Sequence, residues 1–277
     1  MIKPSNLSYT YYSIEKEQYC AERADLIEEM PVSLTVNGEL WITLMCTPIH
    51  LEALAVGFLY NEGIITSKGD IQDVRVCAAG DNVDVWLNST VEKPTDWRRT
   101  SGCTGGVTAV SAEIGRKYSF GSLDNAVTHN QIFDLIGQLL ESQEIYRKSG
   151  GIHASGISDG YRILLVEEDI GRHNTLDKLA GRMLLEEIEI NRRIVVTTGR
   201  ISSEMIQKAA RLGGEIVVSR TAPSSLSCKL AEQWNQTLIG YARRTSFRCY
   251  THPERLILPP QATASAINQP AASQQMD

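Results

Sequence analysis

The sequence lacks features that would mark several large classes of protein. It has no apolar run near the roughly 18 residues that a membrane-spanning helix needs, and its first twenty residues lack the apolar stretch of a signal peptide. Its 33 acidic residues outnumber its 27 basic ones, giving a formal net charge of -6. A basic surplus is normal for nucleic-acid and membrane-surface proteins. We therefore expect a cytoplasmic protein that binds neither nucleic acid nor membranes.

The sequence also lacks any CxxC pair and any internal repeat. Without closely spaced cysteines, neither a zinc site nor a thioredoxin-type redox pair is predicted. In a reducing compartment all the cysteines should be free thiols, and at least five of the six should be ordinary small apolar residues, since free cysteine is often buried. The six are Cys20, Cys46, Cys77, Cys103, Cys228 and Cys249.

What is present is the composition of a globular protein, with 42% hydrophobic and 22% charged residues in 277. In the first half, Asn37-Gly38 joins two β-rich runs, which is a strong hairpin signal. An apolar segment with helical spacing follows Thr47-Pro48 and stops near Asn61, and two alternating strands come after it. These patterns predict a β-rich α+β domain.

In the second half strands and helices alternate. A helix is predicted near residues 130–142, and "RILLVEED", "RRIVVTTGR" and "EIVVSRTAP" are strands that each precede an amphipathic helix, the last one capped by Ser224 or Ser225. This rhythm predicts a largely parallel sheet covered on both faces, so that the fold class is α/β.

The predicted organisation has four parts. They are an N-terminal segment at 1–30, the α+β domain at 31–125 with a cysteine loop at 98–110, a C-terminal α/β domain at 126–258, and a tail at 259–277 that should be disordered because it is rich in Pro, Ala, Ser and Gln.

Two neighbouring predicted strands end in glycine and arginine. "VEEDIGRHNTLDK" places Arg172 and His173 just before a helix, and "TTGRISSEM" places Arg200 in the same position. Ligands bind at the carboxyl ends of strands in open α/β sheets, and helix N-termini beside arginine favour phosphate. The alternatives are a helix capped by Asn174 with Arg172 paired to Glu168 or Asp169, and two independent surface arginines.

Two further stretches are candidates. His153 in "SGGIHASG" is able to donate, accept or carry a proton, although such a histidine is more often structural. In "GYARRTSFRCY", arginines interleave with aromatic residues, as in sites that stack a base and hold phosphates. The same pattern is typical of an edge strand.

The thiol of Cys103 lies in "RRTSGCTGG", among glycines and a few residues after two arginines. Nearby cations favour the reactive thiolate, and a persulfide is one of the reversible states that such a cysteine holds. The alternative is a small residue in a tight turn.

Together these segments resemble one family, the formate dehydrogenase accessory sulfurtransferases (FdhD/NarQ). The resemblance runs from about Pro31 to Arg255, and "EDIGRHNTLDK" and "APSSL" are its most specific motifs. It implies a C-terminal fold similar to cytidine deaminases, a three-layer α/β/α arrangement without their zinc ligands.

The resemblance also implies a function. A cysteine desulfurase would donate sulfur to Cys103 as a persulfide, and that sulfur would pass to a bis(molybdopterin guanine dinucleotide) molybdenum or tungsten cofactor destined for formate dehydrogenase. A guanine nucleotide should mimic the cofactor, a homodimer is expected, and no metal site belongs to the chain itself. The expected cofactor contacts are His153, Arg172, His173, Arg200, Tyr241, Ala242, Arg243, Arg244, Thr245 and Ser246.

One position departs from the family pattern. The family loop commonly carries two cysteines as CxxC, whereas Gly106 stands here where the second would be. A single persulfide-bearing cysteine suffices for transfer. The alternatives are a chaperone that binds the cofactor without sulfur chemistry and a nucleotide-dependent hydrolase that uses His153 or His173.

Overall fold

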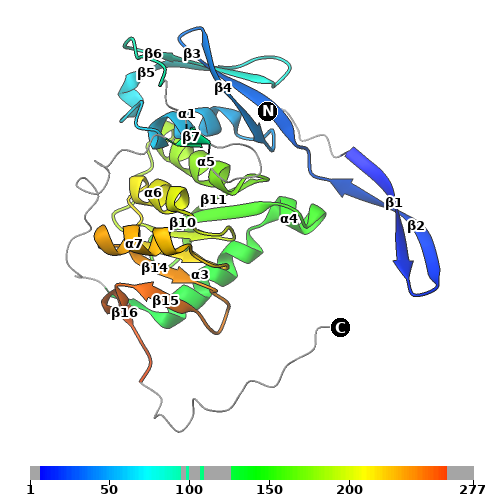
Figure 1. The fold of residues 1–277 in the computed structure, drawn as a ribbon, viewed down its shortest axis with the longest axis vertical. Helices are drawn as coiled ribbons and strands as arrows, with labels where there is room; N and C mark the ends of the chain where they lie inside the picture. The colour runs from blue at the N-terminus through cyan, green and yellow to red at the C-terminus, as the bar shows by residue number, and fades with distance from the viewer. Residues whose placement is uncertain (1–6, 95–97, 100–106, 109–125, 261–277) are drawn as a thin grey trace.

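The protein is described by a computed structural model for residues 7–94, 98–99, 107–108 and 126–260. Its described elements form a mixed α/β structure with two main sheets, one in each half of the chain. Figure 1 shows the smaller sheet stacked above the helices and sheet of the C-terminal half. No helix among these residues is both long and apolar enough to cross a membrane.

The smaller sheet has four strands in the order β4-β3-β6-β5. The predicted hairpin is confirmed, because Asn37 and Gly38 both have positive φ at the turn. The helix after this hairpin is confirmed as well, and its side chains form one core with the sheet. The elements are β3 (Met30–Val36), β4 (Glu39–Cys46), α1 (Leu51–Asn61), β5 (Ile71–Val76) and β6 (Asn82–Leu87).

The larger sheet has six strands in the order β11-β10-β12-β13-β14-β15. β12, β13 and β14 are parallel, but β10 is antiparallel to both of its neighbours and β15 is antiparallel to β14. The prediction of a largely parallel sheet is therefore wrong, since loops without a crossover helix join β10 to β11 and β14 to β15. The strands are β10 (His153–Ser158), β11 (Ile163–Asp169), β12 (Ile194–Thr197), β13 (Ile216–Ser219), β14 (Thr237–Gly240) and β15 (Arg248–Thr251).

Helices cover both faces of the larger sheet, as predicted. Along β12, Val195 packs into the core on one face, while Ile194 and Val196 pack into the core on the other. This is a three-layer arrangement, whereas the likeness to cytidine deaminases stays a prediction. One face is covered by α5 (Arg172–Leu185), α6 (Ser203–Arg211) and α7 (Ser225–Gln233), which begins at the predicted cap Ser224, and the other by α3 (His129–Glu141).

The two halves meet where α1 crosses α5. A Cβ atom added at Gly57 would lie 1.7 Å from the backbone oxygen of Asp177, and one at Gly181 would lie 1.9 Å from that of Ala53. Only glycine leaves room for backbones this close. The N-terminal half is thus fixed against the helix that begins with Arg172 and His173.

Several elements are not predicted by the sequence patterns. The largest is a ribbon of β1 (Leu7–Glu15) and β2 (Gln18–Leu26), which projects away from the rest of the protein (Figure 1). β10 is another. The shorter ones are η1 (Lys68–Asp70), β7 (Arg98–Arg99), β8 (Val107–Thr108), β9 (Val127–Thr128), α4 (Glu144–Ser149), β14 (Thr237–Gly240), η2 (Pro253–Arg255) and β16 (Leu256–Ile257).

Candidate functional site

Loops from five strands meet at one edge of the larger sheet. β11, β12, β13 and β14 all end there, and β10 begins there because it runs in the opposite direction. The loops that follow or precede these strands carry the predicted site residues at 153, 172–173, 200 and 241–246. The structure therefore brings these segments to a single edge, which we call the carboxyl edge. Cys103 lies outside the described residues.

A pocket of about 330 Å³ lies at this edge. It is bordered by α4 and the two glycines that precede β10 on one side and by the loops after β11, β12 and β13 on the other. Of the predicted contacts, His153 lines it directly. Its lining residues are Gln143, Tyr146, Gly150, Gly151, Ile152, His153, Ile170, Thr198 and Arg220.

His153 is held at the floor of this pocket by β10. Its Nδ1 lies 3.4 Å from the hydroxyl of Thr198, which also accepts a hydrogen bond from the backbone N–H of Ala154. Burial lowers the pKa of His153, and the nearby positive charges of Arg172 and Arg200 lower it further. A neutral imidazole beside arginines leaves the positive charge of the site to the guanidinium groups.

The two Gly-Arg loops contact each other, as predicted for neighbouring strand ends. The Arg172 side chain packs across Gly199, where an added Cβ would come within 2.8 Å of the Arg172 Cβ. Neither Arg172 nor Arg200 lines the 330 Å³ pocket. The positive charges of both nevertheless lower the pKa of His153, which does line the pocket.

His173 points away from solvent, between α5 and α6. Its Nε2 lies 3.2 Å from a carboxylate oxygen of Glu204 and 3.4 Å from the hydroxyl of Ser202, which caps α6. Burial is the main reason that the pKa of His173 is lowered to about 4, although Glu204 acts in the opposite direction. This side chain is neutral at pH 7 and is better placed to position the loop than to contact a ligand.

The alternative interpretation of the "DIGRHN" segment is wrong about the helix cap. Gly171, rather than Asn174, caps α5, and the Asn174 amide donates to Asp169 and to the carbonyl of Met45. Asp169 pairs with Lys178 at 2.6 Å, and both side chains are completely buried.

This buried pair ties the loop to the N-terminal half. Asp169 also accepts from the backbone N–H of Thr47, and Lys178 donates to the Thr47 carbonyl. The segment between β4 and α1 is therefore fixed against the end of β11 and against α5, because the buried carboxylate and ammonium need these partners.

Arg220 is a residue that the sequence reasoning missed. It follows β13 directly and lines the pocket, and its buried Nε has no hydrogen-bond partner among the described residues. No described carboxylate pairs with it or with Arg200. A buried guanidinium N–H without an acceptor is suited to an anion. The available signal was "VVSR", the third strand end with arginine in the same rhythm.

The 241–246 stretch is divided between two sides of the edge. Arg243 donates to the carbonyl of Arg220 at 2.5 Å, which places it beside the pocket. Arg244 instead lies over Gly137 of α3 and pairs with Glu141 at 2.7 Å. Ala242 is fully buried, so any contact it makes to a ligand would be through its backbone.

The remaining residues of this stretch are more open. Tyr241 has a positive φ, and its ring is covered on one side by the Arg248 guanidinium at 4.3 Å. Thr245 and Ser246 are exposed. A base would stack on Tyr241 only on its other side or by displacing Arg248.

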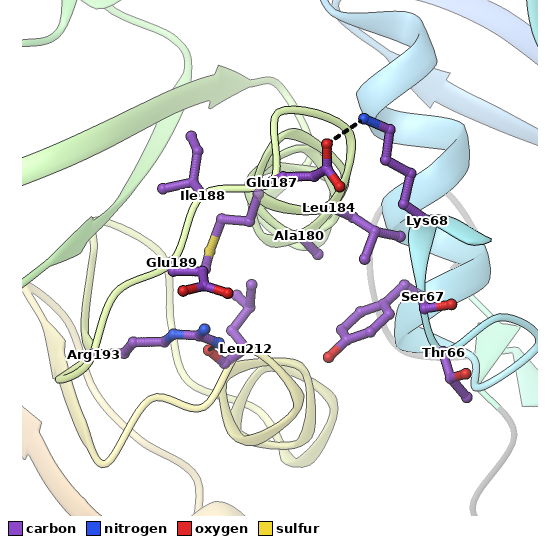
Figure 2. Close-up of a pocket in the computed structure, with 12 residues that line it drawn as sticks. Thr66, Ser67, Lys68, Ala180, Leu184, Glu187, Ile188, Glu189, Arg193 and Leu212 are labelled. Atoms are coloured by element: carbon purple, nitrogen blue, oxygen red, sulfur yellow. Dashed lines mark hydrogen bonds and ion pairs between the residues drawn. The ribbon is translucent and has the colours of Figure 1, made fainter. Parts of the chain in front are cut away.

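A second pocket, of about 320 Å³, lies at the opposite edge of the same sheet (Figure 2). Arg193, which directly precedes β12, lines it, and Lys68 pairs with Glu187 across its mouth at 2.8 Å. Its floor is apolar, with Met183, Leu184 and neighbours. None of the predicted site residues lies there.

The described cysteines only partly follow the expectation. Cys46 is buried, and burial raises its pKa to about 12. Cys20 is exposed on the β1–β2 ribbon, and Cys77, Cys228 and Cys249 are partly exposed. The expectation of burial is therefore wrong for Cys20, because the ribbon has no core. Among the described residues, no group of three or more His, Cys, Asp or Glu side chains is arranged to hold a metal ion.

Comparisons with known proteins agree on one family. A family profile of the FdhD/NarQ family matches residues 27–257. The sulfur carrier protein FdhD of Bacillus pumilus (strain SAFR-032) is 34% identical over 253 residues, which cover 86% of this chain and 93% of the relative. The protein of the same name from Staphylococcus aureus (strain Newman) is 33% identical, covering 83% and 89%.

A solved structure supports the same relationship. It is the crystal structure of a protein described as a formate dehydrogenase accessory protein from Desulfotalea psychrophila. The two structures superpose with a TM-score of 0.74 at 27% sequence identity, covering 91% of this chain and 99% of that one.

Proposed function

Since the chain belongs to the FdhD/NarQ family, we propose that it is a sulfur carrier that serves formate dehydrogenase. In this proposal the Cys103 thiolate attacks the terminal sulfur of a persulfide on a cysteine desulfurase. The donor's sulfur–sulfur bond breaks, the donor leaves as a thiolate, and Cys103 carries the persulfide. The persulfide bond of Cys103 would then break, and the terminal sulfur would become a sulfido ligand of the molybdenum or tungsten in the bis(molybdopterin guanine dinucleotide) substrate. The metal would supply the two electrons by going from the +4 to the +6 state, and Cys103 would leave as a thiol that keeps the proton.

The observation that supports a cofactor site is the group of arginines at the carboxyl edge. Arg220 lines the pocket, Arg243 donates to the Arg220 carbonyl, and Arg172 and Arg200 carry the positive charges that lower the pKa of His153 in the same pocket. Guanidinium groups bind phosphate bidentately, and the buried Nε of Arg220 lacks an acceptor among the described residues. These residues fit the pyrophosphate of a guanine dinucleotide, so they would bind and orient the substrate.

The guanine base needs a flat surface and hydrogen-bond partners. Tyr146 and Tyr241 offer rings at two sides of this edge, and backbone groups of the 241–246 stretch offer donors and acceptors. We propose that the phosphates bind near Arg220 and that the base extends toward one of these rings. His153, being neutral, would accept or donate a hydrogen bond at the pocket floor.

Mass spectrometry of the intact protein tests the carrier role. After incubation with a cysteine desulfurase and cysteine, the wild-type chain should gain the mass of about one sulfur atom per Cys103, and C103A should not. The C77A variant is the matched control, because Cys77 is a partly exposed thiol outside the cysteine loop. In a deletion strain, C103A should fail to mature formate dehydrogenase while still binding a guanine nucleotide.

A second candidate function is favoured by Gly106, which replaces the second loop cysteine of many relatives. The chain would then be a chaperone that holds the cofactor and docks on the apoenzyme without covalent sulfur chemistry. Wild-type protein that gains no sulfur, together with C103A that matures formate dehydrogenase normally, would establish this alternative and reject the carrier role.

A further inference from the structure

The second pocket, which we call the amino-edge pocket, lies where the two halves of the chain meet (Figure 2). Tyr60 and residues 66–68 line it from the N-terminal half, and the ends of α5 and α6 line it from the C-terminal half. Small-molecule sites are common at such boundaries, and their volumes run from about 300 to 1,000 Å³. A volume of about 320 Å³ therefore fits a small ligand better than a large cofactor.

The floor of this pocket is apolar and adaptable. Ala180, Met183 and Leu184 lie at positions i, i+3 and i+4 of α5, so they share one face of the helix. Leu212, which follows α6, extends this surface. A methionine side chain fills irregular gaps, because it is unbranched and flexible. The floor therefore suits an aliphatic or thioether group of a few carbon atoms.

The charged loop after α5 has a fixed backbone. Glu187 adopts a positive φ of 52°, and its N–H donates to the Leu184 carbonyl. The next N–H, that of Ile188, donates to the Met183 carbonyl at 2.9 Å. These bonds form a Schellman motif, which ends the helix and satisfies its last carbonyl groups. The backbone that carries Glu189, the next residue, is therefore fixed to the end of α5.

The guanidinium of Arg193 is also fixed. Its Nε donates to the Ile190 carbonyl at 3.0 Å, and its Nη1 donates to the Leu212 carbonyl at 2.9 Å. Both acceptors are neutral backbone groups. The positive charge of Arg193 therefore has no carboxylate partner in the part of the chain that the structure describes.

Glu189 and Arg193 are thus an acid and a base that line one pocket without pairing. Figure 2 shows both on one side of the cavity, with Thr66 and Ser67 on the other. Among the described residues, Glu189 makes neither a hydrogen bond nor an ion pair. The carbonyl end of α5 adds partial negative charge close to Glu189, which favours a cation there. An ammonium beside Glu189 and a carboxylate beside Arg193 would match both charges.

The other charges of the pocket exclude a ligand of high charge. Lys68 and Glu187 pair with each other at 2.8 Å, so neither needs a partner from a ligand. The four charged lining residues, which are this pair with Glu189 and Arg193, sum to zero. A nucleotide would meet two carboxylates, and a polyamine would meet two cations. The ligand should therefore be neutral overall and carry one group of each sign.

We propose that the amino-edge pocket binds an α-amino acid with an apolar side chain. Its carboxylate accepts from Arg193, its ammonium donates to Glu189, and its side chain packs on the floor formed by α5 and Leu212. The two charged groups of an α-amino acid are attached to one carbon atom, which suits an acid and a base on one side of a small cavity. This site is separate from the carboxyl edge and does not depend on sulfur transfer.

Isothermal titration calorimetry of the full chain tests the proposal with L-leucine as the probe. Leucine should bind with a Kd of about 1 mM or lower. Leucinamide, which lacks the carboxylate, and glycine, which lacks the side chain, should each bind at least about tenfold more weakly. N-acetylleucinamide, which resembles a leucine within a peptide, should not bind. The absence of saturable leucine binding, or equal binding of N-acetylleucinamide, would overturn the proposal.

Two adjacent arginines provide a matched pair of variants. R193Q should weaken leucine binding at least about tenfold, because it removes a charged hydrogen bond to the carboxylate. R192Q should match wild type, since Arg192 pairs with Glu215 and does not line the pocket. Circular dichroism and urea unfolding verify that both variants are folded. Equal weakening by the two variants would reject the site.

E189Q tests the ammonium contact and leaves the hydrogen bonds of Arg193 intact. It should weaken leucine binding by about fivefold or less, since ion pairs of exposed carboxylates are weak, and leave 4-methylpentanoate, which is leucine without its amino group, unchanged. E187Q is the control, because Glu187 already has Lys68 as its partner. Equal weakening of both ligands by E189Q, or weakening of leucine by E187Q alone, contradicts the assignment of Glu189.

Discussion

At the carboxyl edge of the six-stranded sheet, a pocket of about 330 Å³ is lined by Arg220, whose buried Nε has no partner among the described residues, whereas at the amino edge a pocket of about 320 Å³ has Lys68 paired with Glu187 and Arg193 bonded to backbone carbonyls. The volumes are nearly equal. At the carboxyl edge, no described carboxylate pairs with Arg200 or Arg220. At the amino edge, Lys68 already has Glu187. Volume therefore says little about function here, and the charges that lack a protein partner distinguish the edges.

The edges also differ in how their ion pairs are buried, which gives the largest expected effect. D169A would leave Lys178 charged in a completely buried position, and breaking such a pair typically costs about 3–5 kcal/mol. K68A removes a pair whose side chains are 47% and 73% exposed, worth about 0–1 kcal/mol. Urea unfolding of both variants measures the free energies of unfolding. Similar losses would contradict the difference in burial.

The second effect concerns the pH dependence of stability. The pKa of His173 is about 4 when folded, against about 6.5 in the unfolded chain. Below pH 6.5 the unfolded chain gains a proton that the folded protein does not take up. Stability should therefore fall as the pH drops from 6.5 to 4, by on the order of 3 kcal/mol from this residue. H173Q should reduce this slope in urea unfolding at several pH values.

The control for this measurement is H129Q, which replaces a partly exposed histidine at the start of α3. The H129Q variant keeps all the carboxylates whose protonation causes ordinary acid unfolding. A slope that is unchanged in H173Q, or reduced equally in H129Q, would mean that His173 is not the residue responsible.

The third effect is on ligand binding and compares the two edges directly. R220A should weaken the binding of a guanine nucleotide about ten- to hundredfold, because a charged hydrogen bond to phosphate is worth about 1.5–3 kcal/mol. K68A, at the amino-edge pocket, should change it less than about twofold. Isothermal titration calorimetry measures both. If K68A has the larger effect, the nucleotide binds at the amino edge.

Local patterns predict most of the elements but not how they meet. The Asn37-Gly38 turn, the helix stop near Asn61 and the cap at Ser224 depend on short-range geometry, and all three are confirmed. The direction of β10 depends on pairing with β12, about 40 residues away, so no local signal gave it. The same long-range pairing brings His153 to the carboxyl edge.

The partners of buried charges are equally non-local. One alternative paired Arg172 with Glu168 or Asp169. Asp169 instead has Lys178, in the second turn of α5, and the backbone N–H of Thr47, from the other half of the chain, as partners. A carboxylate that is fully buried needs several donors, and those donors are set by the packing of α1 on α5. Sequence spacing therefore predicted a charged loop at the correct strand end, while the structure determined which arginines face the pocket.

The smallest expected effect separates two arginines that are adjacent in sequence. Arg243 bonds to the Arg220 carbonyl beside the pocket, whereas Arg244 lies over α3 and is paired with Glu141. Since Arg244 must leave Glu141 to reach a ligand, and this exposed pair is worth about 0–1 kcal/mol, R244A should weaken nucleotide binding less than about threefold. R243A should weaken it more, by about tenfold, since its guanidinium lies beside Arg220. Titration calorimetry of R243A and R244A, each measured with and without the E141Q substitution, separates the loss of a direct contact to the nucleotide from the loss of the Arg244–Glu141 ion pair. If R244A has the larger effect in both backgrounds, the nucleotide extends over α3 instead of into the 330 Å³ pocket.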